Sequence, residues 1–265
     1  MLGSPEPSIV KKMIQLQQHR GPDGSGVWHD DSVCLGHARL AIVDLEGSPQ
    51  PIQSQEGNVL VANGEIYNFE SIRSSIPNYP WTTFGDSETI LALYEKTIQS
   101  NPIASAKDHA DWVGTLDGMF AFALWNPQLN QLLLARDEMG IKPLIRSKIG
   151  SSLVFSSEVK GLRAHPEFYP QLDQHALMAR LVWEYPLDAT TLFLDVHQVR
   201  PGTVEVWSLV DEVPVLLDTH RFSSPKVSPN EAYDEVQGAH HLLDGFIDSV
   251  GQRLMADVPV GIVLS

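Results

Sequence analysis

The stretch Val59-Leu-Val-Ala-Asn-Gly-Glu-Ile-Tyr-Asn68 joins a short apolar run to a turn rich in polar groups. An apolar run of this length that ends at Asn63-Gly64 is typical of a buried strand followed by a tight turn. Polar side chains at the end of a rigid strand are where proteins commonly hold ligands. The stretch therefore predicts both a core strand and one wall of a site.

Other apolar and periodic segments predict the rest of a layered fold. Helical spacing follows the capping pattern Ser4-Pro5-Glu6 and recurs further along the chain, so helices are expected after residue 6, at Thr89–Ile98 and at Gln174–Trp183. Strands are expected at Val33–Leu35, Leu40–Val43, Val59–Ala62, Met119–Trp125, Leu132–Ala135 and Leu153–Ser156, with a half-buried strand at Thr203–Leu209. Strands in antiparallel-looking runs with helices between them indicate an α+β fold and not a strict βαβ alternation.

The composition changes near the C-terminus. Proline and serine in Phe222–Asn230 predict a linker. Helical periodicity over Ala232–Leu254 and an apolar run at Val258–Ser265 then predict one helix and one buried strand, which cannot form a core of their own. We therefore expect a first domain over 1–217, a linker over 218–230, and the opening of a second domain over 231–265.

The composition restricts the function classes. The 265 residues include 18 basic and 33 acidic side chains, which gives a net charge of −15. Such a surface repels phosphate backbones and anionic lipid, so neither nucleic acid nor a membrane is an expected partner. A single cysteine, Cys34, permits no disulfide within the chain and fits a reducing compartment, so a cytoplasmic location is expected. No metal site is expected at His240, His241 and Asp244, because adjacent histidines face different sides of a helix.

Four segments combine glycine-dependent turns with polar groups, namely Arg20–Gly26, Gly36–Asp44, Asn63–Asn68 and Gly85–Glu88. Arg39 could clamp a carboxylate, and Glu65 or Asp86 could hold an ammonium group. The Asn63 side chain and the Gly64 amide offer two donors for a developing oxyanion. Together these groups suit an α-amino acid whose side-chain carbonyl is attacked. Taken alone, Arg39 could equally form a surface ion pair, while structural roles in turns and caps are expected for Asp23, Asp44 and Asp137.

These segments resemble, in the same order, a class II glutamine amidotransferase domain of the N-terminal-nucleophile hydrolase fold. Within that class the chain is most similar to glutamine-hydrolysing asparagine synthetase, as Leu116–Trp125, Arg136–Leu144, Phe155–Leu162 and Asp257–Ser265 also indicate. The resemblance implies a four-layer αββα sandwich followed by the first helix and strand of an α/β adenylating synthetase domain.

The resemblance also implies roles for individual residues. Arg39 would bind the glutamine α-carboxylate, and Asn63 and Gly64 would form the oxyanion hole. Backbone contacts would come from Leu40, Ala41, Ile42 and Val43, while Glu65 and Asp86 would contact the α-amino end. In such enzymes ammonia passes through a tunnel to a second domain, where ATP and magnesium activate aspartate. The residues present are expected to make no ATP contact, and a homodimer is left open.

The sequence departs from the family pattern at both ends. The family nucleophile is a cysteine directly after the initiator methionine, and here Leu2 stands at that position. Roughly a dozen residues that normally form the first strand are also missing, which predicts a gap in the sheet. Cys34, inside an apolar strand, is expected to be a buried structural thiol, and the chain ends at Ser265, before the phosphate loop. The chain alone is therefore expected to be inactive.

Three interpretations fit this departure. The first is an asparagine synthetase sequence that is truncated or begins at the wrong residue. The second is a β-lactam-type adenylating synthetase whose first domain is not catalytic. The third is a glutamine-binding or scaffolding module without enzymatic activity. The presence of Arg39, Asn63, Gly64, Glu65 and Asp86 together favours the first.

Overall fold

A computed structural model describes residues 1–224 and 234–262 of the chain. The helices are α1 (Pro7–Leu16), α2 (Phe69–Ser75), α3 (Glu88–Ser100), α4 (Ala106–Val113), α5 (Val159–Leu162), α6 (Gln174–Trp183) and α7 (Glu235–Gln252), with a short 3-10 helix at Gln18–Arg20. The strands are β1 (Gly24–His29), β2 (Cys34–Arg39), β3 (Ile52–Gln53), β4 (Val59–Ile66), β5 (Gly118–Asn126), β6 (Gln131–Arg136), β7 (Ile145–Ile149), β8 (Ser152–Ser156), β9 (Val196–Gln198), β10 (Thr203–Val210) and β11 (Val213–Arg221).

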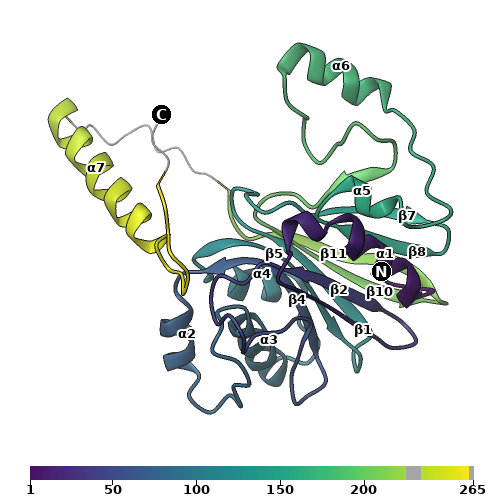
Figure 1. Cartoon of the computed structure of the whole chain (residues 1–265), viewed down its shortest axis with the longest axis horizontal. Coiled ribbons are helices and arrows are strands. Elements are labelled where there is room, and N and C mark those ends of the chain that lie inside the picture. The colour runs from purple at the N-terminus through teal and green to yellow at the C-terminus, as the bar shows by residue number, and fades with distance from the viewer. Residues whose placement is uncertain (225–233, 263–265) are drawn as a thin grey trace.

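The strands form stacked sheets with antiparallel pairing throughout the described ladders (Figure 1). The larger sheet has six strands in the order β11-β10-β6-β5-β4-β3. The opposing layer contains the β1-β2 pair and a three-stranded sheet in the order β8-β7-β9. The antiparallel pairing agrees with the antiparallel runs that the sequence predicts.

Three apolar cores separate four layers. One core lies between the six-stranded sheet and helices α2, α3 and α4, and another lies between the two strand layers. The third lies between the smaller strand layer and helices α1 and α5. Since successive side chains of a strand point to opposite faces, β4 sends Leu60 to the first core and Val59 and Val61 to the second. The predicted αββα sandwich is confirmed.

The first two residues connect the two parts of the smaller layer. Leu2 bridges to Val33 on one side and to Leu153 of β8 on the other. The Met1 nitrogen donates to the Cys34 carbonyl at 2.8 Å, and the Cys34 amide donates back to Met1. Beyond this contact, the facing edges of β2 and β8 line a cavity instead of pairing with one another. The predicted gap is therefore present in the described part of the sheet.

Several predicted elements differ from the structure. The expected strand at Leu40–Val43 is a loop. The strand at Thr203–Leu209 is almost fully buried, and not half-buried, because its two faces pack into two different cores. Strand β11 continues through Arg221, so residues 218–221 belong to the sheet and not to a linker. Residues 258–262 are not a strand, while residues 225–233 and 263–265 lie outside the described part of the chain.

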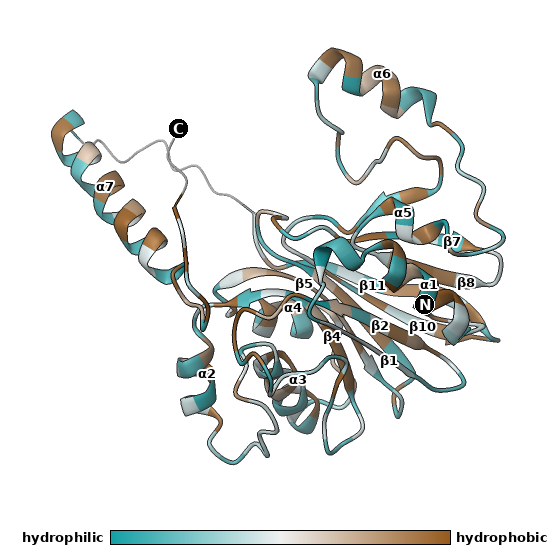
Figure 2. Ribbon diagram, viewed as in Figure 1, coloured by the Kyte–Doolittle hydropathy of each residue, from teal (hydrophilic) through white to brown (hydrophobic). Residues whose placement is uncertain are grey.

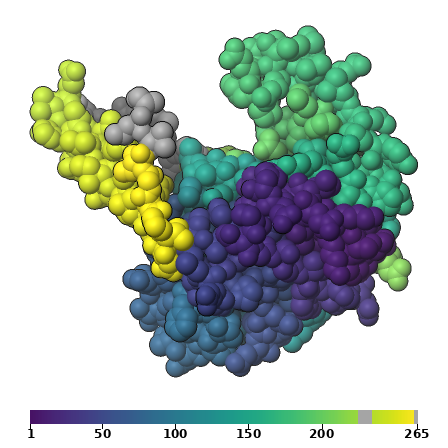
Figure 3. Space-filling view, in the orientation of Figure 1, coloured from purple at the N-terminus to yellow at the C-terminus, as the bar shows by residue number. Residues whose placement is uncertain are grey.

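Helices α6 and α7 stand away from the layers (Figures 1 and 3). Both contain apolar residues, coloured brown in Figure 2. Among them, Met178, Leu181, Leu242 and Phe246 are exposed. Within the described residues, neither these helices nor any other could span a bilayer.

Helix α4 carries a buried histidine on the face that it turns to the core. His109 is fully buried, stacks on Tyr94 with ring centroids 5.5 Å apart, and accepts a hydrogen bond from the Trp112 indole at 3.2 Å. Burial lowers the pKa of His109 to about 4. The folded state therefore holds this imidazole neutral at a pH where an unfolded chain would bind a proton.

We expect the free energy of unfolding to fall as the pH is lowered from about 6.5 to about 4, because only the unfolded state gains a proton on His109 in that window. The loss for this residue is on the order of 3 kcal/mol. Urea titrations at pH 7 and pH 4.5 measure it. His109→Gln should reduce the pH dependence, whereas His220→Gln, on an exposed position of β11, should leave it unchanged. An equal pH dependence in both variants would contradict the assignment.

Candidate active site

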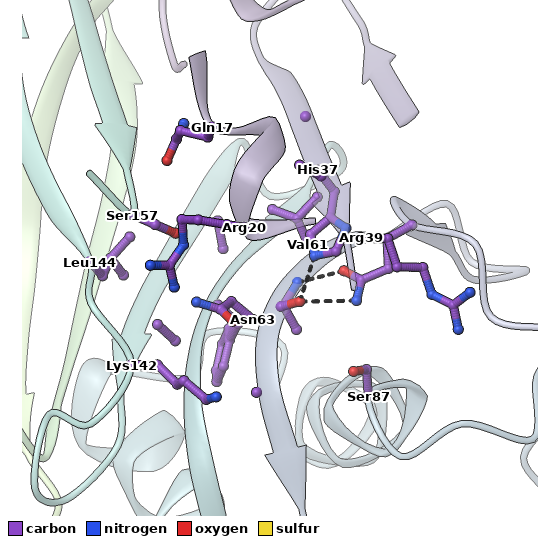
Figure 4. A pocket seen from close by; sticks show the side chains of 18 of the residues that line it. Gln17, Arg20, His37, Arg39, Val61, Asn63, Ser87, Lys142, Leu144 and Ser157 are labelled. Atoms are coloured by element: carbon purple, nitrogen blue, oxygen red, sulfur yellow. Dashed lines mark hydrogen bonds between the residues drawn. The ribbon is translucent and has the colours of Figure 1, made fainter. Parts of the chain in front are cut away.

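A cavity of about 280 Å³ lies between the strand layers where β2 and β4 end (Figure 4). Its wall includes the predicted residues Arg39, Leu40, Ile42, Val43, Asn63, Gly64, Glu65 and Asp86. Ala41 is the exception, and its amide donates to the Asp23 carboxylate at 2.9 Å outside the cavity wall. These wall residues come from three of the four predicted segments, and the fourth segment contributes Arg20, so all four meet at one place.

The two-residue repeat of the strands explains this convergence. In β4, Asn63 and Glu65 continue the face of Val59 and Val61, which points between the sheets. In β2, His37 and Arg39 continue the inward face of Leu35 in the same way. The apolar side chains fill the intersheet core, and the polar ones that follow them along each strand surround the cavity.

The edge of β4 presents amides toward the cavity. The Phe120 N–H and C=O, opposite Gly64, both bond to Asp137, so Gly64 and Phe120 form a non-hydrogen-bonded pair. The Gly64 amide therefore points away from β5. The outward amides on either side of it are occupied, since Ala62 donates to Gln50 at 2.7 Å and Ile66 donates to Asp86 at 2.6 Å.

Asn63 adds a second donor beside the Gly64 amide. Its side-chain nitrogen Nδ2 is buried and has no hydrogen-bond partner among the described residues. A buried donor without a partner is costly unless a ligand satisfies it. The side chain and the neighbouring amide form a donor pair suited to the oxygen of a carbonyl that gains negative charge.

The acidic wall consists of Glu65 and Asp86. The Glu65 Oε2 atom is buried without a partner in the described part of the chain. Burial, with the nearby Asp86 charge, raises the pKa of Glu65 to about 8 even though Lys142 opposes the shift. Burial also raises the pKa of Asp86, against the lowering effect of the Ile66 amide. The pair therefore retains a proton near neutral pH and would be stabilised by a cationic group.

Arg39 supports the loop that follows β2. Its guanidinium donates to the carbonyl oxygens of Leu45, Val43 and Asp44 at 2.7, 3.2 and 2.6 Å. These bonds leave two of the five arginine N–H donors for a ligand. Figure 4 shows the guanidinium directed away from the Asn63 side chain, so a ligand carboxylate held by Arg39 would lie at the far end of the site from the donor pair.

Two further cationic side chains, Arg20 and Lys142, line the cavity. Arg20 points toward the space beside Asn63 and donates to Glu158 at 3.2 Å, and Lys142 approaches the same space from below in Figure 4. Lys142 follows the loop that Asp137 builds by accepting from the amides of Phe120, Met139, Ile141 and Lys142. The structural role predicted for Asp137 is confirmed, as are those of Asp23 and Asp44.

Two neutral residues of the wall were also missed. His37 and Gln50 both bond the Ala62 peptide, which lies directly before Asn63. The inward face of β2 could have indicated His37. Gln50 carried no such signal, because it lies between two prolines outside any predicted strand.

Cys34 also contributes to the wall but is a poor nucleophile. It is buried at the start of β2, and burial raises the pKa of its thiol. The thiolate is the reactive form, so a raised pKa leaves this sulfur protonated at neutral pH. The expectation of a buried structural cysteine is confirmed.

The layered fold and the cavity between its sheets are consistent with one class of protein, the class II glutamine amidotransferase domains. A glutamine amidotransferase domain family matches residues 2–213, and the chain belongs to this family. Among solved structures, glutamine phosphoribosylpyrophosphate amidotransferase from Bacillus subtilis, complexed with ADP and GMP, superposes with a TM-score of 0.57 at 20% identity. That match covers 83% of this chain and 47% of the other, and at this identity it supports the N-terminal-nucleophile hydrolase fold alone.

The curated relatives are glutamine-hydrolysing asparagine synthetases. Asparagine synthetase 1 of Bacillus subtilis (strain 168) is 32% identical over 97% of this chain, and asparagine synthetase B of Escherichia coli (strain K12) is 31% identical over 96%. The aligned region is 38% of the length of each relative. The chain thus spans about two fifths of the relatives that it matches.

Substitution of Gly64 tests the close approach at the donor pair. A Cβ atom at this position would lie 2.1 Å from the Met119 carbonyl oxygen and 2.7 Å from the Phe120 Cα, both backbone atoms. We expect Gly64→Ala to lower the free energy of unfolding by about 2 kcal/mol, because the β4–β5 ladder must shift. Urea denaturation measures the change.

Gly245→Ala is the matched control for this substitution. A Cβ at Gly245 of α7 meets no atom within 4 Å, so this variant should be about 0.5 to 1 kcal/mol more stable than the parent chain. A Gly64→Ala chain as stable as the parent would show that β4 and β5 are not closely packed at this position.

Proposed function

We propose that this chain is the glutamine-handling part of a glutamine-dependent asparagine synthetase. The observation that supports it best is the pairing of two unsatisfied buried groups in one cavity, the donor Asn63 Nδ2 and the acceptor Glu65 Oε2. A free α-amino acid with a side-chain amide offers partners to both. Its ammonium group would donate to Glu65 and Asp86, and its side-chain carbonyl would accept from Asn63 and the Gly64 amide.

In this proposal Arg39 binds the α-carboxylate through its remaining N–H donors, at the loop of Leu40, Ala41, Ile42 and Val43. When a thiolate attacks the bound amide carbonyl, the oxygen gains charge and the two donors strengthen their hydrogen bonds to it. The carbon–nitrogen bond then breaks, the amide nitrogen takes up a proton and leaves as ammonia, and water hydrolyses the resulting thioester to glutamate and the free thiol. A donor of this kind contributes about 3 kcal/mol to lowering the barrier in comparable oxyanion holes.

The ammonia would serve an ATP-dependent amidation of aspartate, with ATP and magnesium bound outside the residues of this chain. We further propose that the chain by itself binds glutamine without hydrolysing it. The raised pKa of Cys34 supports this, since Cys34 is the one cysteine of the sequence and burial keeps its thiol protonated. A glutamine-binding role without catalysis in this chain is therefore part of the same proposal.

Glutamine should raise the melting temperature of the chain by several degrees at saturating concentration, because it binds only the folded state. Arg39→Ala should abolish the shift by removing the carboxylate partner. The control is Arg200→Ala, which removes an exposed arginine that pairs with Asp188 at 2.6 Å. This control should keep the full shift, and a parent chain that glutamine leaves unchanged would remove the glutamine-binding proposal.

Glutamine binding at pH 7 should release about one proton, because an ammonium group beside Glu65 lowers a carboxyl pKa that is about 8 in the free chain. The affinity should accordingly rise with pH up to about 8. Titration calorimetry in buffers of different ionisation enthalpy measures the proton count.

Glu65→Gln should remove the pH dependence, whereas Glu70→Gln, at an exposed position on α2, should preserve it. Heats that do not depend on the buffer in the parent chain would contradict the assignment of the ammonium end to Glu65.

A further inference from the structure

The peptide group of Ala62 is held by side chains and not by a neighbouring strand. The Gln50 Oε1 atom accepts from the Ala62 amide at 2.7 Å, and Gln50 Nε2 donates to the Ala62 carbonyl at 2.9 Å. His37 Nε2 donates to the same carbonyl at 2.9 Å. The three dashed lines of Figure 4 mark these bonds. Ala62 directly precedes Asn63, so they act at the start of the donor pair.

The register of the sheet explains why a side chain is needed here. Strand β3 pairs Ile52 with Leu60 and Gln53 with Val59. The same register would place residue 50 opposite Ala62. Strand β3 begins only at Ile52, so the main chain does not extend the ladder to residue 50. A primary amide carries both a donor and an acceptor, and it reproduces the two bonds of a hydrogen-bonded antiparallel pair.

The surroundings fix Gln50 in this position. On β1, a Cβ atom at Gly26 would lie 2.1 Å from the Gln50 carbonyl oxygen, so glycine permits a close backbone approach. His37 must carry its proton on Nε2 to donate to Ala62, which leaves Nδ1 as an acceptor without a partner among the described residues. Burial lowers the pKa of His37 to about 4, and the ring therefore keeps this neutral form near pH 7.

The Gln50 bonds also restrain the next outward amide of β4, that of Gly64. Gln50 fixes the Ala62 end of the edge, and Asp86 fixes the Ile66 end at 2.6 Å. The Gly64 amide lies between these two anchors. A β4 edge without the Gln50 anchor would keep its β5 pairing but lose the partner of the Ala62 amide, and only His37 would still hold the Ala62 carbonyl.

We propose that Gln50 is a positioning residue that replaces a strand at the edge of β4 and aligns the Asn63 and Gly64 donors, with His37 as its second support. This inference rests on the proposed function, because it assigns the donors to a glutamine carbonyl. It predicts that loss of the Gln50 amide impairs recognition of the carbonyl more than recognition of the amino-acid head group.

The test compares L-glutamine with L-norleucine, which has a side chain of similar length but no carbonyl. In Gln50→Glu an oxygen replaces the donor that faces the Ala62 carbonyl, and in Gln50→Met both hydrogen bonds are lost at similar volume. We expect either variant to reduce the ratio of glutamine to norleucine affinity about tenfold, while norleucine affinity changes less than about twofold. Gln53→Glu, at an exposed position on β3, should preserve the ratio.

Amide NMR spectra of the full chain provide a readout that does not need a ligand. Removing the Gln50 anchor should move the signals of the Gly64 backbone amide and the Asn63 side-chain amide, with the melting temperature of Gln50→Met close to that of the parent. Changes confined to Ala62, or an unchanged affinity ratio in both folded variants, would overturn the positioning role. If the parent chain binds no glutamine, the proposed function fails, and the NMR comparison still decides whether Gln50 aligns the donors.

Discussion

Strand β4 lies in one of the two inner layers, and its two-residue repeat determines which core or edge each successive group faces. Its side chains alternate between the core under the helices and the core between the sheets. Its backbone alternates as well, between bonds to β5 and outward groups on its free edge. Where the partner strand β3 ends, this edge becomes a wall of the cavity, so the ladder that holds the sheet together also orients the donors.

Side chains take over the edge where the ladder ends. Gln50 satisfies Ala62, and the Asp86 carboxylate satisfies Ile66. The Gly64 amide lies between these two anchors, at a half-buried position of the cavity wall. The residues on either side of Gly64, Asn63 and Glu65, carry the Nδ2 and Oε2 atoms that have no partner among the described residues. Unpaired polar groups concentrated in one cavity lower stability and favour a ligand that completes them.

The sequence was sufficient to predict the buried strands of the sheets but not the strands and side chains at the sheet edges. Near-continuous apolar runs identified β5 and β6, which are covered on both faces. Strand β11 was missed because it is an edge strand with mostly exposed side chains, so it lacks the apolar alternation that identifies a strand. The site residues of β2 and β4 followed from turn glycines next to polar groups, whereas Gln50 acts through a register that only the folded sheet defines.

The prediction of a strand at Leu40–Val43 was wrong because the backbone groups of this segment bond to side chains and to another loop. A β-type composition there predicts a strand, but the Ala41 amide bonds to Asp23 and the Val43 carbonyl accepts from Arg39. The Asp257 amide donates to the Ile42 carbonyl, and the Asp257 carboxylate accepts from the Asp44 amide at 2.7 Å. Figure 3 shows this C-terminal segment lying against the body of the chain. With these groups occupied, the loop cannot join a ladder, and its shape depends on both Arg39 in the site and the segment that follows α7.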